Sequence, residues 1–294
     1  MRCCLFCRVV LTRATRSKEH VIPGWLLDHL GIRQQPTQPS VLASGGKDRL
    51  VQRDLTYDGF RAGRVCGCCN KGWMSKLEEA SKPILVRLMS GELQPTCLCV
   101  AEQLVLGRWA AKTAYALSST SDRFNTRIPP SHPVILRESA QALPPNVAVF
   151  AHQLPLAHDR WQRPTWLCSA SAFRYDIAGR RPAEQEIKRL HHSSYKICLQ
   201  FQRLLLLVAS WSEAHWIPVY WRGIHQPIVP HPELAHYNRA AAEFPDHDGL
   251  ARLASHTSLA VAHKSVVHAV DCLPAPPPVW LDLPPELWNF VTPR

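Results

Sequence analysis

The chain has 294 residues, enough for one large domain or two ordinary ones, and 46% of them are hydrophobic, so a sizeable core can form. Its formal net charge of +11 favours an anionic partner, most commonly nucleic acid. No apolar run reaches the roughly 18 residues that span a bilayer, and the N-terminus lacks the features of a secretory signal. We therefore expect a cytoplasmic protein without a membrane partner.

Residues 1–80 are basic and rich in cysteine, and they show little regular periodicity. A short strand is predicted at residues 8–12 and a short helix at residues 23–30, where apolar residues recur at helical spacing. A longer helix is expected from about Asn70 to Met89 on the same grounds. Most of the remaining segment, residues 34–53, has the polar composition of a loop.

The region from residue 91 onward predicts a larger α+β domain with a mainly antiparallel sheet. An amphipathic helix is expected at residues 101–118, packed on that sheet, and the proline-rich stretch 127–145 predicts an irregular connection. Four strand-like runs follow, at residues 146–154, 165–173, 195–209 and 216–221. The third run is long enough for one strand or for a hairpin. A short helix at 232–244 and an extended proline-rich tail complete the chain.

Eleven cysteines are present, an odd number, and in a reducing cytoplasm clustered cysteines indicate a metal site more often than disulfides. Two of the clusters have CxxC spacing: Cys4 with Cys7, and Cys66 with Cys69. Two such turns supply the four thiolates of a tetrahedral structural zinc site. Free buried cysteines are the alternative, and Cys3 or Cys68 could replace a neighbour as a ligand.

Between the two cysteine pairs lies the sequence EHVIP, which begins with Glu19 and His20, and Asn70 directly follows the second pair. The order CxxC, EHVIP and CxxCN at a helix start resembles the HNH nucleases, which have a ββα-metal fold. The resemblance covers about residues 4–80. With GWMSKLE after CCN and the later WAAKTA, the chain also resembles a group of bacterial HNH proteins with a C-terminal region of no assigned role. We therefore expect an HNH module at residues 1–90 and a separate domain at 91–294.

The resemblance also implies site residues. His20 matches the general base, and Glu19 and Asn70 match the ligands of a catalytic Mg²⁺ or Mn²⁺ ion. A carboxylate and an amide oxygen suit such a hard cation. The sequence departs from the family because no Asn lies between His20 and Asn70 to orient the histidine. Asp54, Asp58 or a backbone carbonyl could take that role. Without the resemblance, Glu19 and His20 could be an ordinary polar pair, and Asn70 a helix N-cap.

The implied function is that of a metal-dependent HNH endonuclease acting on double-stranded DNA. Because an unrestrained nuclease would damage its host, we expect a gated effector of bacterial defence against foreign DNA, with a regulatory protein partner. A catalytically inactive zinc module that binds DNA or protein is the first alternative, and an RNA-cleaving toxin is the second. Five basic residues could line a phosphate path or form a solvated face: Arg2, Arg8, Arg13, Arg16 and Lys18.

Overall fold

The computed structural model describes residues 2–37, 55–120, 128–145, 147–153, 165–169, 195–210 and 226–227. Within these ranges the chain combines helices with antiparallel strands, so the expected α+β class is confirmed at that level. Among the described residues no helix is both long and apolar enough to cross a bilayer. The strand predicted at 216–221, the helix at 232–244 and the proline-rich tail lie outside the described residues.

A five-stranded antiparallel sheet has the strand order β4–β5–β6–β3–β7. Its strands are β3 (Val147–Gln153), β4 (Thr165–Ser169), β5 (Tyr195–Phe201), β6 (Leu204–Ser210) and β7 (Gln226–Pro227). The long apolar run from residue 195 is thus a hairpin, and its two-residue turn holds Gln202 at φ 50°. The strands predicted at 146–154 and 165–173 are confirmed as β3 and β4, although the described part of β4 is shorter.

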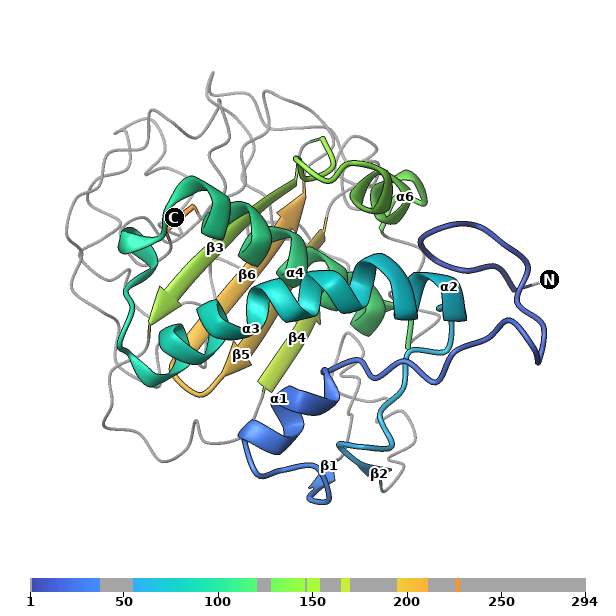
Figure 1. Cartoon of the computed structure of the whole chain (residues 1–294), viewed down its shortest axis with the longest axis horizontal. Helices are drawn as coiled ribbons and strands as arrows, with labels where there is room; N and C mark the ends of the chain where they lie inside the picture. The colour runs from blue at the N-terminus through green and yellow to red at the C-terminus, as the bar shows by residue number, and fades with distance from the viewer. Residues whose placement is uncertain are drawn as a thin grey trace, which may run out of the picture.

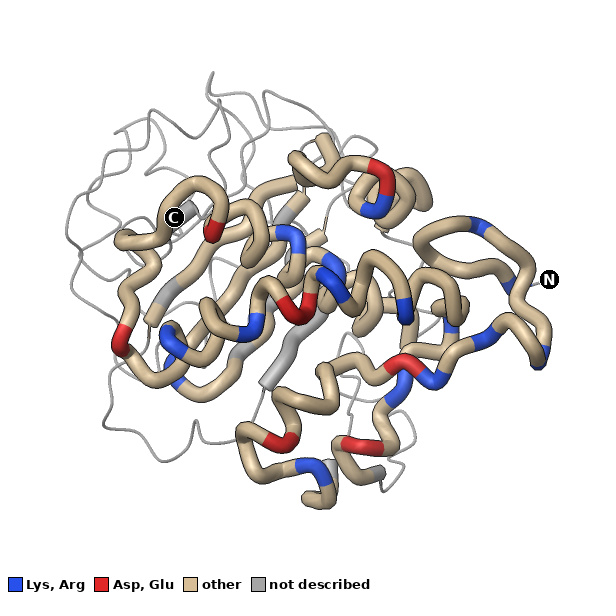
Figure 2. Tube along the Cα trace, viewed as in Figure 1, with Lys and Arg blue, Asp and Glu red and all other residues tan. Residues whose placement is uncertain are grey.

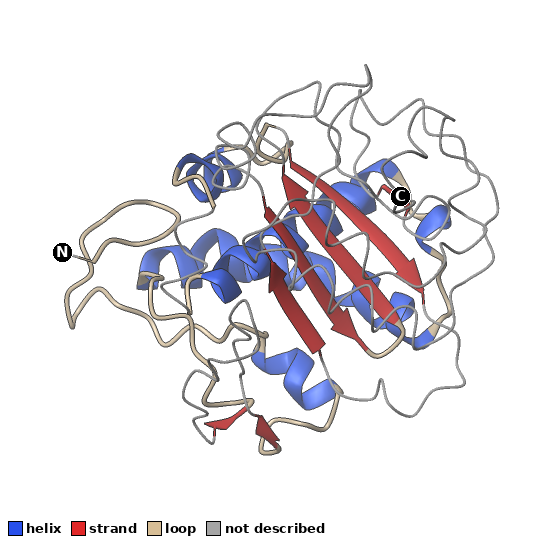
Figure 3. Cartoon of the chain, turned by 180° about the vertical axis from the view of Figure 1, so that it is seen from behind, coloured by secondary structure: helices blue, strands red, loops and turns tan. Residues whose placement is uncertain are grey.

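Two helices cover one face of the sheet, as Figure 1 shows from the front and Figure 3 from behind. Helix α4 (Val100–Ser118) contacts β3, β5 and β6, and helix α3 (Ser75–Ser90) packs on α4. A buried glutamine ties the sheet to the end of α3, because Gln153 Nε2 donates to the carbonyl oxygens of Leu88 at 2.7 Å and Leu93 at 2.6 Å. The helix predicted at 101–118 is therefore confirmed, and so is its packing on an antiparallel sheet.

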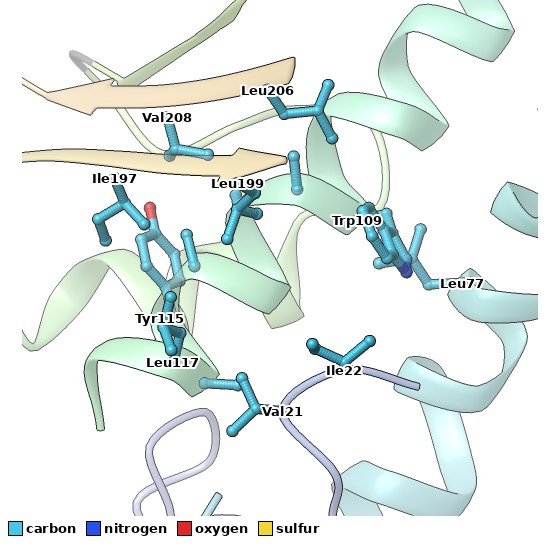
Figure 4. Close-up of a cluster of buried hydrophobic side chains, with 14 of the residues drawn as sticks. Val21, Ile22, Leu77, Trp109, Tyr115, Leu117, Ile197, Leu199, Leu206 and Val208 are labelled. Atoms are coloured by element: carbon cyan, nitrogen blue, oxygen red, sulfur yellow. The ribbon is translucent and has the colours of Figure 1, made fainter. Parts of the chain in front are cut away.

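One hydrophobic cluster connects the N-terminal segment, both helices and the sheet. Figure 4 labels ten of its residues: Val21, Ile22, Leu77, Trp109, Tyr115, Leu117, Ile197, Leu199, Leu206 and Val208. In sequence order they come from the EHVIP segment, α3, α4, β5 and β6. The cluster runs across residues 90 and 91, and the division into domains 1–90 and 91–294 stays a prediction.

The N-terminal segment is built mainly from short elements. These are α1 (Gly24–His29), β1 (Pro36–Thr37), β2 (Leu55–Thr56) and α2 (Gly67–Cys69), followed by a π-helical turn (Asn70–Met74) that leads into α3. Helix α1 confirms the helix predicted at 23–30. It ends where Gly31 adopts φ 65°, which lets Ile32 N–H donate back to Leu27 O at 3.1 Å.

Three local predictions were wrong. Residues 8–12 form no strand beyond a single bridge from Cys3 to Val10. The stretch 127–145 contains helix α6 (Ser131–Glu138), because Arg108 donates to the carbonyl oxygens of Leu136 and Ala140 at its C-terminal end. Helix α4 is not amphipathic over its second half, since residues 106–118 are buried all round between the sheet and α3.

Candidate functional site

Four cysteine sulfurs gather in the N-terminal segment, as the spacing predicted. The Sγ atoms of Cys4, Cys7, Cys66 and Cys69 all lie within 4.8 Å of one another. Cys4 Sγ is 3.9 Å from Cys69 Sγ, and Cys7 Sγ is 3.5 Å from Cys66 Sγ. Because Zn–S bonds are about 2.3 Å long, the sulfurs of a tetrahedral site lie about 3.8 Å apart. The cluster could hold a metal ion and is compatible with structural zinc.

The backbone around the first pair makes the tight turn that such a site needs. Arg8 N–H donates to Cys4 O at 3.0 Å and Cys4 N–H donates to Val9 O at 2.8 Å, while Arg8 adopts φ 62°. Backbone amides also point at sulfur, since Cys66 N–H donates to Cys4 Sγ at 3.4 Å and Cys69 N–H to Cys66 Sγ at 3.4 Å. Such donors favour thiolates, which are the form that binds zinc.

The thiols of the cluster differ in acidity. The hydrogen bond between the Cys4 and Cys69 sulfurs lowers the pKa of Cys4 to about 4, against the opposing effect of burial. Burial raises the pKa of Cys7, and the interaction with Cys4 raises the pKa of Cys69. Cys4 therefore ionises more readily than Cys7 or Cys69, and a bound cation would stabilise the thiolates of its neighbours.

Asn70 is the C-cap of α2, so its predicted alternative role as a helix N-cap was wrong. Helix α2 begins at Gly67 with Cys66 as its N-cap, and the sulfur of Cys66 accepts the amide of Cys69. Asn70 lies one turn further on, where its N–H donates to Cys66 O at 3.1 Å. It is half-buried and opens the π-helical turn that joins α2 to α3.

His20 lies in a polar network with an aspartate and two arginines. Its Nε2 atom is 3.0 Å from Asp58 Oδ1, and its Nδ1 atom is 2.8 Å from Arg61 Nη1. Arg61 Nη2 donates to Asp58 Oδ2 at 2.8 Å, and Arg33 Nη1 donates to Asp58 Oδ1 at 2.7 Å. Asp58 therefore contacts the histidine that the missing family asparagine would orient, whereas Asp54 lies outside the described residues.

The network fixes the state of the imidazole. A guanidinium can only donate, so Nδ1 of His20 must accept from Arg61, and Nε2–H donates to Asp58. Burial lowers the pKa of His20, with Arg61 acting in the same direction and Asp58 opposing. Hydrogen bonds from Arg33 and His20 lower the pKa of Asp58 to about 2. At neutral pH the ring is neutral beside an ionised carboxylate, and its basic nitrogen is covered by Arg61.

Glu19 points into a different environment. It is buried, with its Oε1 atom 3.6 Å from the ammonium of Lys112, which also contacts Glu78. Lys112 belongs to the buried half of α4 and is fully inaccessible to solvent, and Glu78 belongs to α3. Burial raises the pKa of Glu19, and the attraction of Lys112 opposes that rise. One cation from α4 thus joins the EHVIP segment to α3.

Glu19 and His20, two of the three residues predicted for a catalytic site, are held in different networks. Neighbouring side chains of an extended segment point to opposite sides, and Glu19 and His20 do so here: one contacts Lys112, the other Asp58 and Arg61. Within the described part of the chain no hydrogen bond links either residue to Asn70. The catalytic Mg²⁺ or Mn²⁺ site at Glu19 and Asn70 stays a prediction.

Sequence reasoning missed Arg33, Arg61, Glu78 and Lys112 as members of these networks. Lys112 did carry a signal, because it is the only charge in the apolar run Trp109-AAKTAYAL. A lone charge within such a run predicts a buried partner. Arg33 and Arg61 carried no such sequence signal, because only the folded chain brings them to Asp58.

Comparison of the chain with protein-family models, with curated protein sequences and with solved structures gives no match. Any functional assignment therefore depends on the chemistry of the sites described above.

Proposed function

We propose that this protein is an HNH-type endonuclease that hydrolyses phosphodiester bonds of DNA, with His20 as its general base. The observation that carries the proposal is the hydrogen bond of 3.0 Å between His20 Nε2 and Asp58 Oδ1, in a loop that the cysteine cluster fastens. A base needs one nitrogen anchored and the other free to accept a proton. Asp58 is such an anchor, and it occupies the role of the absent asparagine.

The nitrogen that would accept the proton is Nδ1. In this structure it accepts a hydrogen bond of 2.8 Å from Arg61 Nη1. The side chain of Arg61 is one-third exposed, so a phosphate group can reach it. A guanidinium binds phosphate well, because it offers two parallel N–H donors to the phosphate oxygens. A nucleic-acid phosphate that draws Arg61 away from the ring would leave Nδ1 able to take a proton from an attacking water. The depressed pKa of His20 keeps the ring unprotonated for this task at neutral pH.

Zinc at the four cysteines has a structural role in this proposal. The Mg²⁺ or Mn²⁺ ion of the resemblance would polarise the phosphate when bound, but Glu19 is held by Lys112 and does not face His20. We derive no catalytic step through that ion. The covered Nδ1 and the paired Glu19 agree with a nuclease that is held inactive until a target or a partner protein engages it, as a defence effector would require.

The test is a plasmid-nicking assay with zinc-loaded protein and added Mg²⁺ or Mn²⁺. We expect the wild type to cut and His20→Ala to lose at least about 100-fold in rate, the lower range for a general base. His29→Ala is the matched control, because His29 is exposed at the end of α1 and should leave the rate unchanged. Equal rates for wild type and His20→Ala would refute the assignment. A parallel digest of RNA of equal length separates the DNA enzyme from the RNA-cleaving toxin.

A second candidate function is a zinc module that binds DNA or protein without cutting. Two observations favour it: the ion pair of Glu19 with Lys112 and the contact of Arg61 with the basic nitrogen of His20. Absence of cleavage by the wild type with either ion, in protein shown to bind DNA, would support this candidate over the first.

A further inference from the structure

The loop of residues 8–18, which we name the basic loop, projects from the body of the molecule beyond α2 (Figure 1). It connects Cys7 of the cysteine cluster to Glu19 and His20. Figure 2 shows basic residues along this part of the chain and no acidic ones. In the sequence the first acidic residue is Glu19, which is buried against Lys112.

The basic loop is held in one shape by its own backbone and by the second cysteine pair. Thr12 and Thr15 exchange amide-to-hydroxyl hydrogen bonds of 3.2 and 2.8 Å, and Thr15 Oγ1 donates to Val10 O at 3.2 Å. Its far end is fastened to the cluster segment, since Gly67 N–H donates to Thr15 O and Ser17 N–H donates to Val65 O, both at 2.9 Å. A ligand that binds the loop therefore meets a preorganised surface.

The charges of the basic loop are free for a partner. Arg8, Arg13, Arg16 and Lys18 are all exposed, and none of them forms an ion pair with another described residue. The same loop presents Val9 and Val10, which are 45% and 41% exposed. Elsewhere in the described part of the chain Val100 is the one other large hydrophobic side chain with comparable exposure.

These features favour duplex DNA over other anionic partners. Single-stranded nucleic acid is held by aromatic side chains on which bases stack, and residues 8–18 contain no aromatic side chain. Some duplex-binding proteins combine arginines on the phosphates with apolar side chains that enter the minor groove. The basic loop has both, on one rigid projection that runs directly into His20.

We propose that the basic loop is a docking site for duplex DNA, in which its arginines contact phosphates and Val9 and Val10 contact the groove. This inference deepens the proposed function, because it names the surface that would hold the substrate. The loop leads directly into Glu19 and His20 along the chain. It does not depend on cleavage, and it holds equally for a module that binds DNA without cutting it.

The test measures the affinity of zinc-loaded protein for a fluorescent 24-base-pair duplex against salt concentration, without Mg²⁺ or Mn²⁺ so that no strand is cut. Each phosphate contact contributes about 0.9 to the slope of log affinity against log salt. The double variant Arg13→Gln/Arg16→Gln should therefore reduce the slope by about 1.8. Lys82→Gln/Arg87→Gln removes the same charge from exposed positions of α3 and should leave the slope unchanged.

The valines give an independent readout. Val9→Ser/Val10→Ser should weaken binding about tenfold, since each valine has less than half its surface left to bury, and it should not alter the salt slope. Equal salt slopes for Arg13→Gln/Arg16→Gln and for the control Lys82→Gln/Arg87→Gln would overturn the proposal. Tight binding of single-stranded RNA with no binding of the duplex would also overturn it. Failure of the nicking assay alone would refute the nuclease and leave the docking site standing.

Discussion

Replacing Lys112 with methionine removes the buried cation that pairs with the buried carboxylate of Glu19 and the partly exposed carboxylate of Glu78. The ammonium of Lys112 is fully buried, contacts Glu78 and lies 3.6 Å from Glu19, whose side chain is 8% exposed. Methionine has a similar length without the charge, so packing changes little while the electrostatic balance is lost. This variant separates a structural role of Glu19 from the metal-ligand role that the sequence resemblance implied.

The expected cost follows from the burial of the cluster. Removing one partner of a buried ion pair costs about 3–5 kcal/mol, because the remaining charge is left uncompensated. Glu78 retains 20% side-chain exposure, and Glu19 can take up a proton, so we expect the lower end, about 3 kcal/mol. Adding Glu19→Gln to Lys112→Met removes the stranded charge and should restore at least about 1 kcal/mol.

The assay is urea unfolding of zinc-loaded protein at several pH values, with Lys76→Met on the exposed face of α3 as the control. Without Lys112 the pKa of Glu19 rises further above its unfolded value, since burial already raises it and Lys112 lowers it. A carboxyl group with a raised pKa in the folded state stabilises the fold fully at acid pH, and this stabilisation is lost as pH rises. The free energy of unfolding of Lys112→Met should therefore fall as pH rises above about 4.5. A loss no greater than that of Lys76→Met, with no such pH dependence, would refute the buried ion cluster.

Two further predictions concern histidines. Burial lowers the pKa of His132 to about 4. The contribution of its neutral ring to the free energy of unfolding is therefore complete above about pH 6.5, and up to about 3 kcal/mol of it is lost as pH falls toward 4. Urea unfolding should show this loss for the wild type and not for His132→Gln. Arg61→Gln should raise the pKa of His20, because the guanidinium disfavours the protonated ring. Imidazole proton shifts measured by NMR would check this, and an unchanged pKa would mean that Arg61 does not cover Nδ1 in solution.

Short sequence patterns predicted the cysteine cluster and the central strands, because these depend mainly on residues close together in the chain. The two CxxC pairs predicted the sulfur cluster, because two residues between cysteines set their sulfurs on one turn whatever the rest of the chain does. Alternating and continuous apolar runs predicted β3 and the β5–β6 hairpin, since a sheet that packs against helices needs such runs. Asp58 was among the candidates to orient His20, and its carboxylate contacts the imidazole at 3.0 Å.

The failures involve partners that are far apart in the sequence. The partner of Glu19 was not foreseen, because Lys112 is remote in sequence and is brought to the carboxylate only by the packing of α4. Residues 127–145 were predicted to form an irregular connection because they are rich in proline. Their composition gave no sign that Arg108 donates to the carbonyl oxygens of Leu136, in α6, and of Ala140, just beyond it. In each case a buried cation from α4 decided the outcome, and its position depends on how α4 packs against the sheet.

The central claim is that zinc bound by four thiolates fastens the basic loop and the His20 segment to the start of α2. Native mass spectrometry of the intact protein tests it most directly. We predict one zinc ion per chain, with its loss from Cys69→Ser and its retention in Cys68→Ser, whose thiol is exposed and outside the cluster. A folded wild-type protein that binds no zinc, or a Cys68→Ser variant that loses zinc as readily as Cys69→Ser, would contradict it.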